Sequence, residues 1–192
     1  MYDLLFFLYT CSSWYFFSLM IIPASDEYVN IKYNICMDMK TKVTLHNWTE
    51  PIANQEITRI RHEVFVIEQK VPQEEEMDTN DEISLHILVH VMKNDGSFSP
   101  VATGRLLPDG HIGRVAVMKP FRKMGIGSLI MTELEKQAIK RGMVAIELDA
   151  QLQAVPFYNR LGYNAIGNIF TDAGILHRKM RKKINFQNDE NV

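Results

Sequence analysis

Two glycines close to an arginine mark the stretch of this sequence best suited to bind an anion. Residues 115–130 read VAVMKPFRKMGIGSLI, and they place Arg122, Gly125 and Gly127 between a strand-like pattern and an amphipathic helix pattern. Glycine leaves backbone N–H groups uncovered. The first turn of a helix has N–H groups without partners, and the helix dipole favours negative charge there. The pattern predicts a phosphate or pyrophosphate site, with a purely structural strand-to-helix turn as the alternative.

Two better-known phosphate loops fit this stretch less well. A P-loop requires Gly-Lys-Ser/Thr, whereas Gly127 is followed by Ser128 and Leu129. A dinucleotide-binding fingerprint requires a small residue three positions after its second glycine, and Ile130 stands there. What remains is Arg-x-x-Gly-x-Gly.

A second motif follows one helix and one strand later. Residues 154–163 read AVPFYNRLGY, a short helix with an aromatic pair and a Leu-Gly-Tyr ending. In this order, the two motifs resemble the acetyl-CoA pyrophosphate loop and the later aromatic helix of the GCN5-related N-acetyltransferases. The resemblance covers about residues 115–163 and implies direct transfer of an acetyl group from acetyl-CoA to an amine.

The resemblance also implies roles for individual residues. Backbone groups of the fourth strand would pair with the pantetheine arm, the loop would hold the pyrophosphate, and backbone N–H groups would stabilise the oxyanion. Tyr158 would protonate the departing thiolate, a role that a phenol can fill. The expected acetyl-CoA-binding residues are Val115, Ala116, Val117, Arg122, Lys123, Met124, Gly125, Ile126, Gly127, Ser128, Phe157 and Tyr158.

The general base is not evident from the resemblance. Family members often carry a glutamate just before the Val-x-Val of the fourth strand, where this chain has Gly113 and Arg114. Asp149, His177 and Glu68 are the alternatives that the sequence offers.

Further stretches resemble a narrower branch, the ElaA-like acetyltransferases, and the glucosamine-phosphate N-acetyltransferases of apicomplexan parasites. They are RHEVFVIEQKVPQEEEMD, GRLL, LDAQLQAVPFYNRLGY and DAGILH. This resemblance favours glucosamine 6-phosphate as the acceptor. Arg105 and Arg114 are expected on adjacent strands, where they could converge on its phosphate with His86 and His177 beside them. The alternative is that these four are ordinary surface or strand-pair residues. A polyamine, an amino acid, a protein lysine or a non-catalytic acyl-CoA-binding module are the alternatives.

The elements that must position these residues follow from hydrophobic spacing and turn signals. Apolar residues at Ile57, Ile60, Val64 and Ile67 line one face of a helix that opens at Pro51. The acidic run 74–82 has no apolar pattern and predicts a solvated loop. The pattern predicts a single α/β domain. The resemblance implies a mixed, mostly antiparallel sheet of six to seven strands, about four flanking helices, and a splay between strands four and five. The expected strands are 43–48, 84–93, 101–107, 111–118, 144–150, 163–170 and 175–183. The expected later helices are one that carries Ile126 to Ala138 and ends near Gly142, and one over 154–162.

Composition narrows the partners. The formal net charge is −2, which gives no general attraction for nucleic acid. The two cysteines, Cys11 and Cys36, precede the expected domain, so a disulfide scaffold, cysteine-ligated zinc and a cysteine nucleophile within it are excluded. We expect no metal.

The chain divides into a hydrophobic extension (1–40), the catalytic domain (41–183) and a polar tail (184–192). Residues 4–22 carry no charge and are long enough to cross a bilayer. They are a membrane anchor, a packed arm, or sequence upstream of a true start at Met39. Lysines follow this segment, so an anchor would leave the domain in the cytosol. The cysteine usage favours a reducing, cytoplasmic compartment, and the resemblance implies a homodimer.

Overall fold

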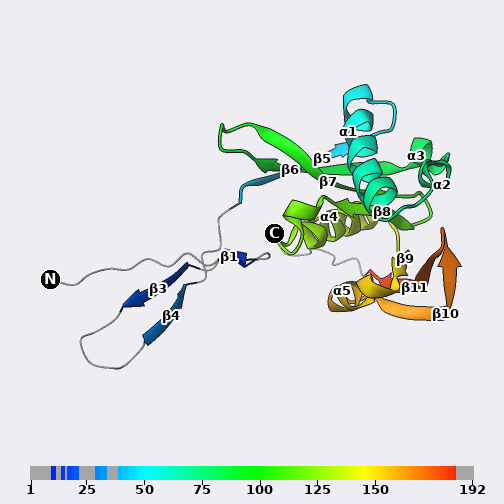
Figure 1. Cartoon of the computed structure of the whole chain (residues 1–192). Coiled ribbons are helices and arrows are strands. Elements are labelled where there is room, and N and C mark those ends of the chain that lie inside the picture. Colours follow the sequence, from blue (N-terminus) through cyan, green and yellow to red (C-terminus); the bar gives the residue numbers. More distant parts are fainter. Residues whose placement is uncertain (1–9, 12–13, 16, 22–28, 34–38, 185–192) are drawn as a thin grey trace, which may run out of the picture. The chain divides into compact units, whose positions relative to one another are not determined.

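The computed structural model describes residues 10–11, 14–15, 17–21, 29–33 and 39–184 (Figure 1). The chain forms two compact units, residues 1–39 and 40–192. In the first unit, β1 (Thr10–Cys11) pairs with β2 (Trp14–Tyr15), and β3 (Phe17–Ile21) pairs with β4 (Val29–Tyr33). The rest of the predicted extension and the tail from residue 185 lie outside the described residues. No helix of the described part is long and apolar enough to cross a membrane.

The described part of the second unit contains seven strands in two sheets. Four antiparallel strands form the first sheet in the order β5-β6-β7-β8, and β10-β11-β9 form the second. This confirms the α/β architecture and the predicted break between the fourth and fifth strands of the domain. The strands are β5 (Thr41–His46), β6 (Leu85–Met92), β7 (Phe98–Leu106), β8 (Ile112–Val117), β9 (Ala145–Gln151), β10 (Asn164–Asp172) and β11 (Ile175–Lys183).

Helices cover both faces of the four-stranded sheet (Figure 1). One face carries α1 (Pro51–Arg61), whose Ile57 and Ile60 are fully buried beside Leu88 and Ala116. The other face carries α4 (Ile126–Lys140). The remaining helical segments are η1 (His62–Glu68), α2 (Gln73–Glu76), α3 (Asn80–Ile83), η2 (Lys119–Phe121), η3 (Leu152–Ala154) and α5 (Val155–Arg160).

A glycine on β7 lets α4 approach the sheet. A Cβ added to Gly104 would lie 2.8 Å from Cγ2 of Ile130 and 3.2 Å from Cδ1 of Leu134. Ile130 is the residue that excludes a dinucleotide-binding fingerprint, because the helix of that fold needs a small residue there. In this chain the small residue stands on the strand and the large one on the helix.

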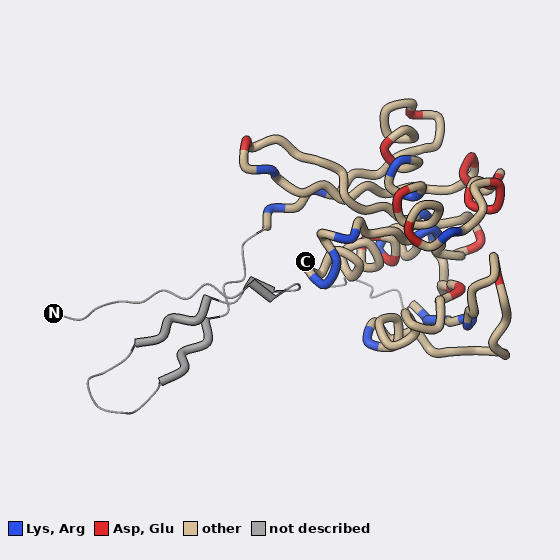
Figure 2. The backbone as a smooth tube through the Cα atoms, in the orientation of Figure 1, with Lys and Arg blue, Asp and Glu red and all other residues tan. Residues whose placement is uncertain are grey.

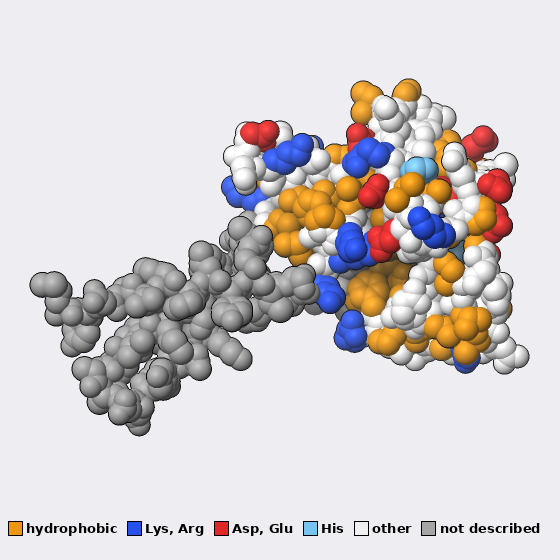
Figure 3. Space-filling model, viewed as in Figure 1, with side chains coloured by type: hydrophobic (Ala, Val, Ile, Leu, Met, Phe, Trp, Pro, Cys, Tyr) orange, Lys and Arg blue, Asp and Glu red, His pale blue; other side chains and the backbone are white. Residues whose placement is uncertain are grey.

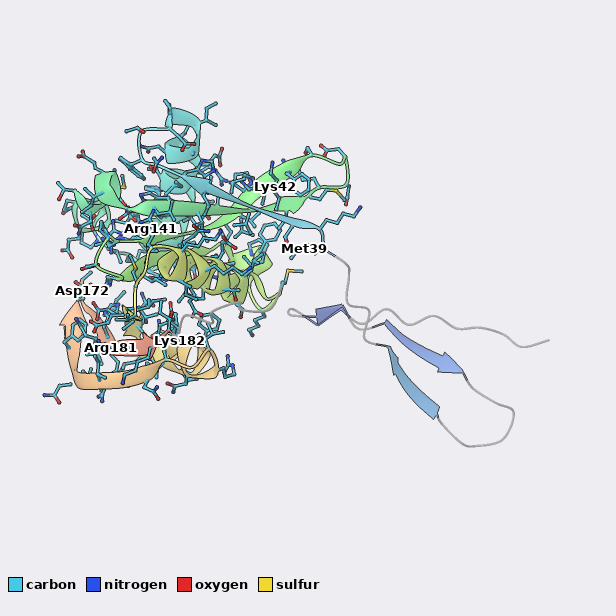
Figure 4. The ribbon with its side chains drawn as sticks, turned by 180° about the vertical axis from the view of Figure 1, so that it is seen from behind. Met39, Lys42, Arg141, Asp172, Arg181 and Lys182 are labelled. Atoms are coloured by element: carbon cyan, nitrogen blue, oxygen red, sulfur yellow. The ribbon has the colours of Figure 1, made fainter. Side chains whose placement is uncertain are left out.

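The three-stranded sheet is tied to α4 through β11. Lys182, labelled in Figure 4, extends Nζ to within 2.7 Å of Oε2 of Glu135 and lies 5.5 Å from the ring centroid of Tyr163. Tyr163 is buried behind α5. These contacts connect the two expected motifs through one packed region.

The first long helix departs from the predicted pattern at its end. Ile57, Ile60 and Val64 are buried as expected, but the prediction for Ile67 is wrong, since it is 49% exposed. The helix continues as the π-helix η1, in which hydrogen bonds span five residues. The wider turn rotates Ile67 away from the face that α1 buries.

The prediction of a solvated loop for residues 74–82 is also wrong. This segment contains α2 and α3, and Glu76 and Asp81 are 3% and 1% exposed. Figure 2 shows the acidic segment close to basic positions of the neighbouring elements. The carboxylates have partners on α1 and β7, far away in the sequence, and these partners allow them to be buried.

The surface charges are mixed on the face of the domain that Figure 3 shows. Lysine and arginine side chains lie there among acidic and hydrophobic ones, and on that face they form no continuous basic area. A nucleic-acid backbone is bound mainly through such an area. This face therefore agrees with the small net charge of the sequence.

Candidate active site

The first two strands of the site, β8 and β9, separate after a single point of contact. The Glu147 N–H donates to the Gly110 carbonyl (3.2 Å), and His111 forms a parallel bridge with Glu147. Beyond this bridge the described part shows no further pairing of β8 with β9. The two strands therefore leave backbone groups available where they diverge.

A β-bulge lies in β8 close to this divergence. Thr103 pairs with Ala116 and Arg105 with Gly113, so Arg114 and Val115 together face Gly104. Arg114 has a φ of 52°, a left-handed conformation that is uncommon for a residue with a side chain. A bulge leaves one residue outside the hydrogen-bonded ladder, and backbone strain of this kind is concentrated at functional sites.

The loop before α4 exposes backbone N–H groups. Lys123 and Gly125 have left-handed φ values of 62° and 83°, with Met124 between them. Alternation of this kind turns successive N–H groups into a concave anion-binding nest. Gly125 is the N-cap of α4, no side chain caps the helix, and its first turn has no acidic residue. The predicted pyrophosphate loop therefore has the geometry that an anion needs.

Arg122 has a carboxylate partner in this structure. Its two terminal nitrogens donate to Oε1 and Oε2 of Glu68, each at 2.6 Å, and its Nε donates to the Val117 carbonyl (2.9 Å). The hydrogen bond from Arg122 lowers the pKa of Glu68. Glu68, predicted as a base, is thus a weakened base that lies beside the anion loop.

The aromatic helix packs directly on this loop. A Cβ added to Gly127 would lie 3.3 Å from Cζ of Phe157. The absence of a side chain at Gly127 therefore makes room for the Phe157 ring. Tyr158 contacts Phe157 and Tyr163 edge to face. Burial raises the pKa of Tyr158 to about 12. The phenol is therefore protonated at neutral pH, as a proton donor must be.

The two arginines predicted to bind an acceptor phosphate lie on adjacent strands but already have partners. Arg105 donates to Asp78 (2.6 and 2.7 Å) and Asp81 (2.6 Å). Arg114 donates to the carbonyls of Glu75 and Glu76 and to Oδ2 of Asp78 (3.1 Å). These bonds engage both guanidinium groups within the domain, so neither is free to bind an acceptor phosphate.

The two predicted histidines have different environments. His86 is 1% exposed, its Nε2 bonds the Asp81 carbonyl (2.9 Å), and burial lowers its pKa. A side chain in that position has no surface to offer an acceptor. His177 is 8% exposed, stacks on Phe170, and lies opposite Gln151 in the β9–β11 ladder.

Asp149 lies near His111, which was not among the predicted site residues, where β8 and β9 begin to diverge. His111 Nε2 lies 3.8 Å from Oδ2 of Asp149. Oδ1 of Asp149 is buried and has no hydrogen-bond partner within the described ranges. Burial lowers the pKa of His111, although Asp149 opposes the shift. The sequence does place a histidine, His111, at the start of the strand that carries Val-x-Val. It lies two residues before Gly113, where the family often has a glutamate.

Among the residues that the structure describes, no group of three or more His, Cys, Asp or Glu side chains could hold a metal ion. The arrangement instead fits a thioester of coenzyme A. The nest and the uncapped helix suit a pyrophosphate, the β8 bulge leaves backbone groups outside the ladder, and the phenol of Tyr158 is protonated at neutral pH. The fold and site define an acyl-CoA-dependent N-acyltransferase.

Comparison with known proteins agrees. The acetyltransferase (GNAT) domain model matches residues 49–184, so the chain belongs to the GNAT acetyltransferase family and uses acetyl-CoA. It is 45% identical over 127 residues to an uncharacterized N-acetyltransferase, YjcF, of Bacillus subtilis, covering 64% of this chain and 87% of that protein. An acyl-CoA N-acyltransferase from Pseudomonas aeruginosa matches with a TM-score of 0.65 and 27% identity over 74% of this chain and 99% of that one. Escherichia coli ElaA matches in fold, with a TM-score of 0.64 and 24% identity over 74% and 99% of the two chains.

Proposed function

We propose that this acetyltransferase acts on the primary amine of a small, polar molecule that carries an anionic group, with glucosamine 6-phosphate as the first candidate. The observation that carries the proposal is a polar surface on the three-stranded sheet, next to the divergence of β8 and β9. It includes Lys179, whose ammonium group forms no ion pair with a carboxylate of the described residues.

This surface follows from strand alternation. On β9, the buried Ile146, Leu148 and Ala150 alternate with Glu147, Asp149 and Gln151, which are only partly buried. Residues opposite one another in an antiparallel pair share a face of the sheet. The three polar residues therefore share their face with their β11 partners, which are Arg181, Lys179 and His177.

On this face Arg181 has a carboxylate partner, whereas Lys179 has none among the described residues. Arg181 Nε lies 3.5 Å from Oε1 of Glu147, so these two charges offset each other. Lys179 stands opposite Asp149, and its charge reaches His111. A cation beside the proposed reaction centre favours an acceptor with a phosphate or carboxylate, whereas a polyamine would be repelled by it.

The amide groups on the same face extend it toward η1. Gln151 Nε2 donates to Oε1 of Gln69 at 2.8 Å, which links the end of β9 to the residue that follows η1. Amide side chains offer both donors and acceptors, as the hydroxyl groups of a sugar require. This polar lining supports a small hydroxylated acceptor over an apolar one.

The test is release of coenzyme A from acetyl-CoA by the full chain and by the chain that starts at Met39. Glucosamine 6-phosphate, glucosamine, spermidine, amino acids and a lysine peptide are offered in parallel. We expect saturable release with the sugar phosphate and weak release with glucosamine. Release with spermidine or the peptide alone would contradict the proposal.

Substitution of Lys179 makes the same test specific. Lys179→Gln should lower kcat/KM for the phosphorylated sugar by about 10- to 100-fold, since a hydrogen bond to a charged group contributes about 1.5–3 kcal/mol. It should change kcat/KM for glucosamine little. Lys183→Gln, an exposed lysine at the end of the same strand, is the matched control.

We further propose that the enzyme is a cytoplasmic homodimer that pairs through β10. In the described part β10 pairs only with β11, nearly all its residues are exposed, and Ile169 and Leu176 of this hairpin are each 51% exposed. An exposed edge strand with apolar residues is a template for pairing with a second chain. Light scattering should give the mass of a dimer, and Ile169→Lys should give that of a monomer.

A further inference from the structure

We propose that His111, which lies beside Asp149, is the general base that removes a proton from the acceptor amine. The inference rests on the acetyltransferase activity but not on the identity of the acceptor. His111 would take the role of the glutamate that many family members carry where this chain has Gly113 and Arg114.

The position of His111 supports this role. It forms the last bridge between β8 and β9, and the two strands diverge immediately after it. The bulge at Arg114 and Val115 follows three residues later on the same strand. The imidazole thus lies at the closed end of the divergence, and the anion loop lies beyond its open end.

Two polar atoms without partners border the imidazole. Arg105 Nε and Asp149 Oδ1 are buried, and neither has a hydrogen-bond partner within the described ranges. A Cβ added to Gly113 would lie 3.8 Å from Arg105 Nε and 3.8 Å from Cδ2 of His111. The Arg105 guanidinium and the His111 ring therefore both approach the backbone at Gly113. Buried polar atoms without partners are rare, and a catalytic role is one explanation for them.

The charges that face His111 come from four elements or turns. Asp149 on β9 and Asp109 in the preceding turn favour the imidazolium, while Lys179 on β11 and Arg105 on β7 disfavour it. Burial adds to the second effect and lowers the pKa of His111 below its usual value. The ring is consequently neutral at neutral pH and able to accept a proton. Once it is protonated, Asp149 at 3.8 Å stabilises the new charge.

The reaction balances with these groups. An acceptor ammonium gives one proton to His111, and the lone pair of the resulting amine forms a C–N bond with the thioester carbonyl carbon. The C–S bond breaks, its electron pair leaves with sulfur, and Tyr158 protonates the thiolate. The excess proton on nitrogen restores Tyr158 through solvent, and His111 releases its proton. The products are an amide, a thiol and one proton.

Histidine NMR of the full chain tests the proton acceptor without any amine. The His111 signals, assigned by their loss in His111→Gln, should titrate below the usual histidine range. In Asp149→Asn the midpoint should fall further, because the imidazolium loses its carboxylate neighbour. A midpoint at or above the usual value, or one that does not move in Asp149→Asn, would overturn the pairing.

Kinetics test the catalytic step. His111→Ala and His111→Gln should lower kcat by about 100-fold or more, the usual contribution of general base catalysis. The affinity for acetyl-CoA should not change. The deficit should shrink for a weakly basic amine such as 2,2,2-trifluoroethylamine, which is already neutral and needs no base. An equal deficit with both kinds of amine would refute the role.

Two further measurements separate this proposal from the choice of acceptor. Slow hydrolysis of acetyl-CoA in the absence of amine should fall at least 10-fold in His111→Ala, because water also needs a base. If no amine of the panel is acetylated but hydrolysis depends on His111, the acceptor proposal fails and this one stands. Unchanged hydrolysis would refute the base. His90→Gln is the matched control, since burial also lowers the pKa of His90, which lies on β6 beside Thr44.

Discussion

Replacing Asp81 by Asn should destabilise the domain more than any other single loss of charge in the acidic segment. Asp81 is 1% exposed, and its Oδ1 accepts from Nη1 of Arg61 (2.7 Å) and Nη1 of Arg105 (2.6 Å). Arg61 is itself fully buried, and Arg105 is 4% exposed. The substitution keeps the shape of the side chain but leaves two buried cations short of a counter-charge.

The magnitude follows from that burial. Removing one partner of a buried ion pair costs about 3–5 kcal/mol, because the remaining charge is left uncompensated. Glu76 and Asp78 still bind the two arginines, which favours the lower end of the range. For a domain of this size, each kcal/mol shifts Tm by about 3 °C, so we expect Tm to fall by about 10 °C.

Thermal and urea unfolding of the chain from Met39 measure the change. Glu82→Gln is the matched control, because Glu82 is the next residue and is exposed. The control should change the free energy of unfolding by less than about 0.5 kcal/mol. A loss below about 1 kcal/mol in Asp81→Asn would refute the view that this cluster supports the fold.

The same cluster predicts a loss of stability in acid. Burial alone would raise the pKa of Asp81, but the hydrogen bonds and charges of Arg61 and Arg105 outweigh it and lower the pKa. The unfolded chain therefore binds a proton at a higher pH than the folded one. The stabilisation is present above the ordinary Asp pKa and is lost as the pH falls through the lowered folded value. Asp81→Asn should flatten this part of the stability profile.

Three further substitutions probe the site and the packing around it. Tyr158→Phe should lower turnover by about 100-fold and leave acetyl-CoA affinity unchanged, since only a proton donor is removed; unchanged turnover would show that another group is the acid. Glu68→Gln should raise acetyl-CoA affinity up to about 5-fold by releasing Arg122 from a partly exposed pair, and lower affinity in calorimetry would show instead that Glu68 positions the arginine. Gly104→Ala should cost about 1–3 kcal/mol through its contact with Ile130, and Ile130→Ala in the same chain should recover part of this loss, whereas purely additive effects would place the strain elsewhere.

The sequence alone determined the fold and the acetyl-CoA half of the site. The strands alternate and the helices repeat with clear periods, and the turn between them is short, so the spacing by itself places Arg122, Gly125 and Gly127 at a strand-to-helix junction. Backbone N–H groups at such a junction depend on local conformation, and local conformation is what a short motif specifies. Tyr158 could be placed for the same reason.

Only the tertiary structure decided which charges are free. Arg105 and Arg114 read as open cations in the sequence, but the acidic segment, about 30 residues earlier, covers them in the folded chain. In the same way, Glu76 and Asp81 read as solvated, but their partners bury them. The sequence does not show whether a charged side chain is paired. Ion pairs between residues this far apart in the sequence form only when the chain packs.

The proposed base illustrates the same limit. His111 and Asp149 lie on strands separated by the whole of α4, and no spacing rule connects them. His111 lies near Asp149 because the chain pairs with β9 at one bridge before β8 and β9 diverge, and partial burial of the ring lowers the pKa of His111. The sequence determined which elements form and where the predicted anion loop lies. The packing of two sheets decided which side chains meet at the reaction centre, because proton transfer and charge pairing depend on distances that only the folded chain sets.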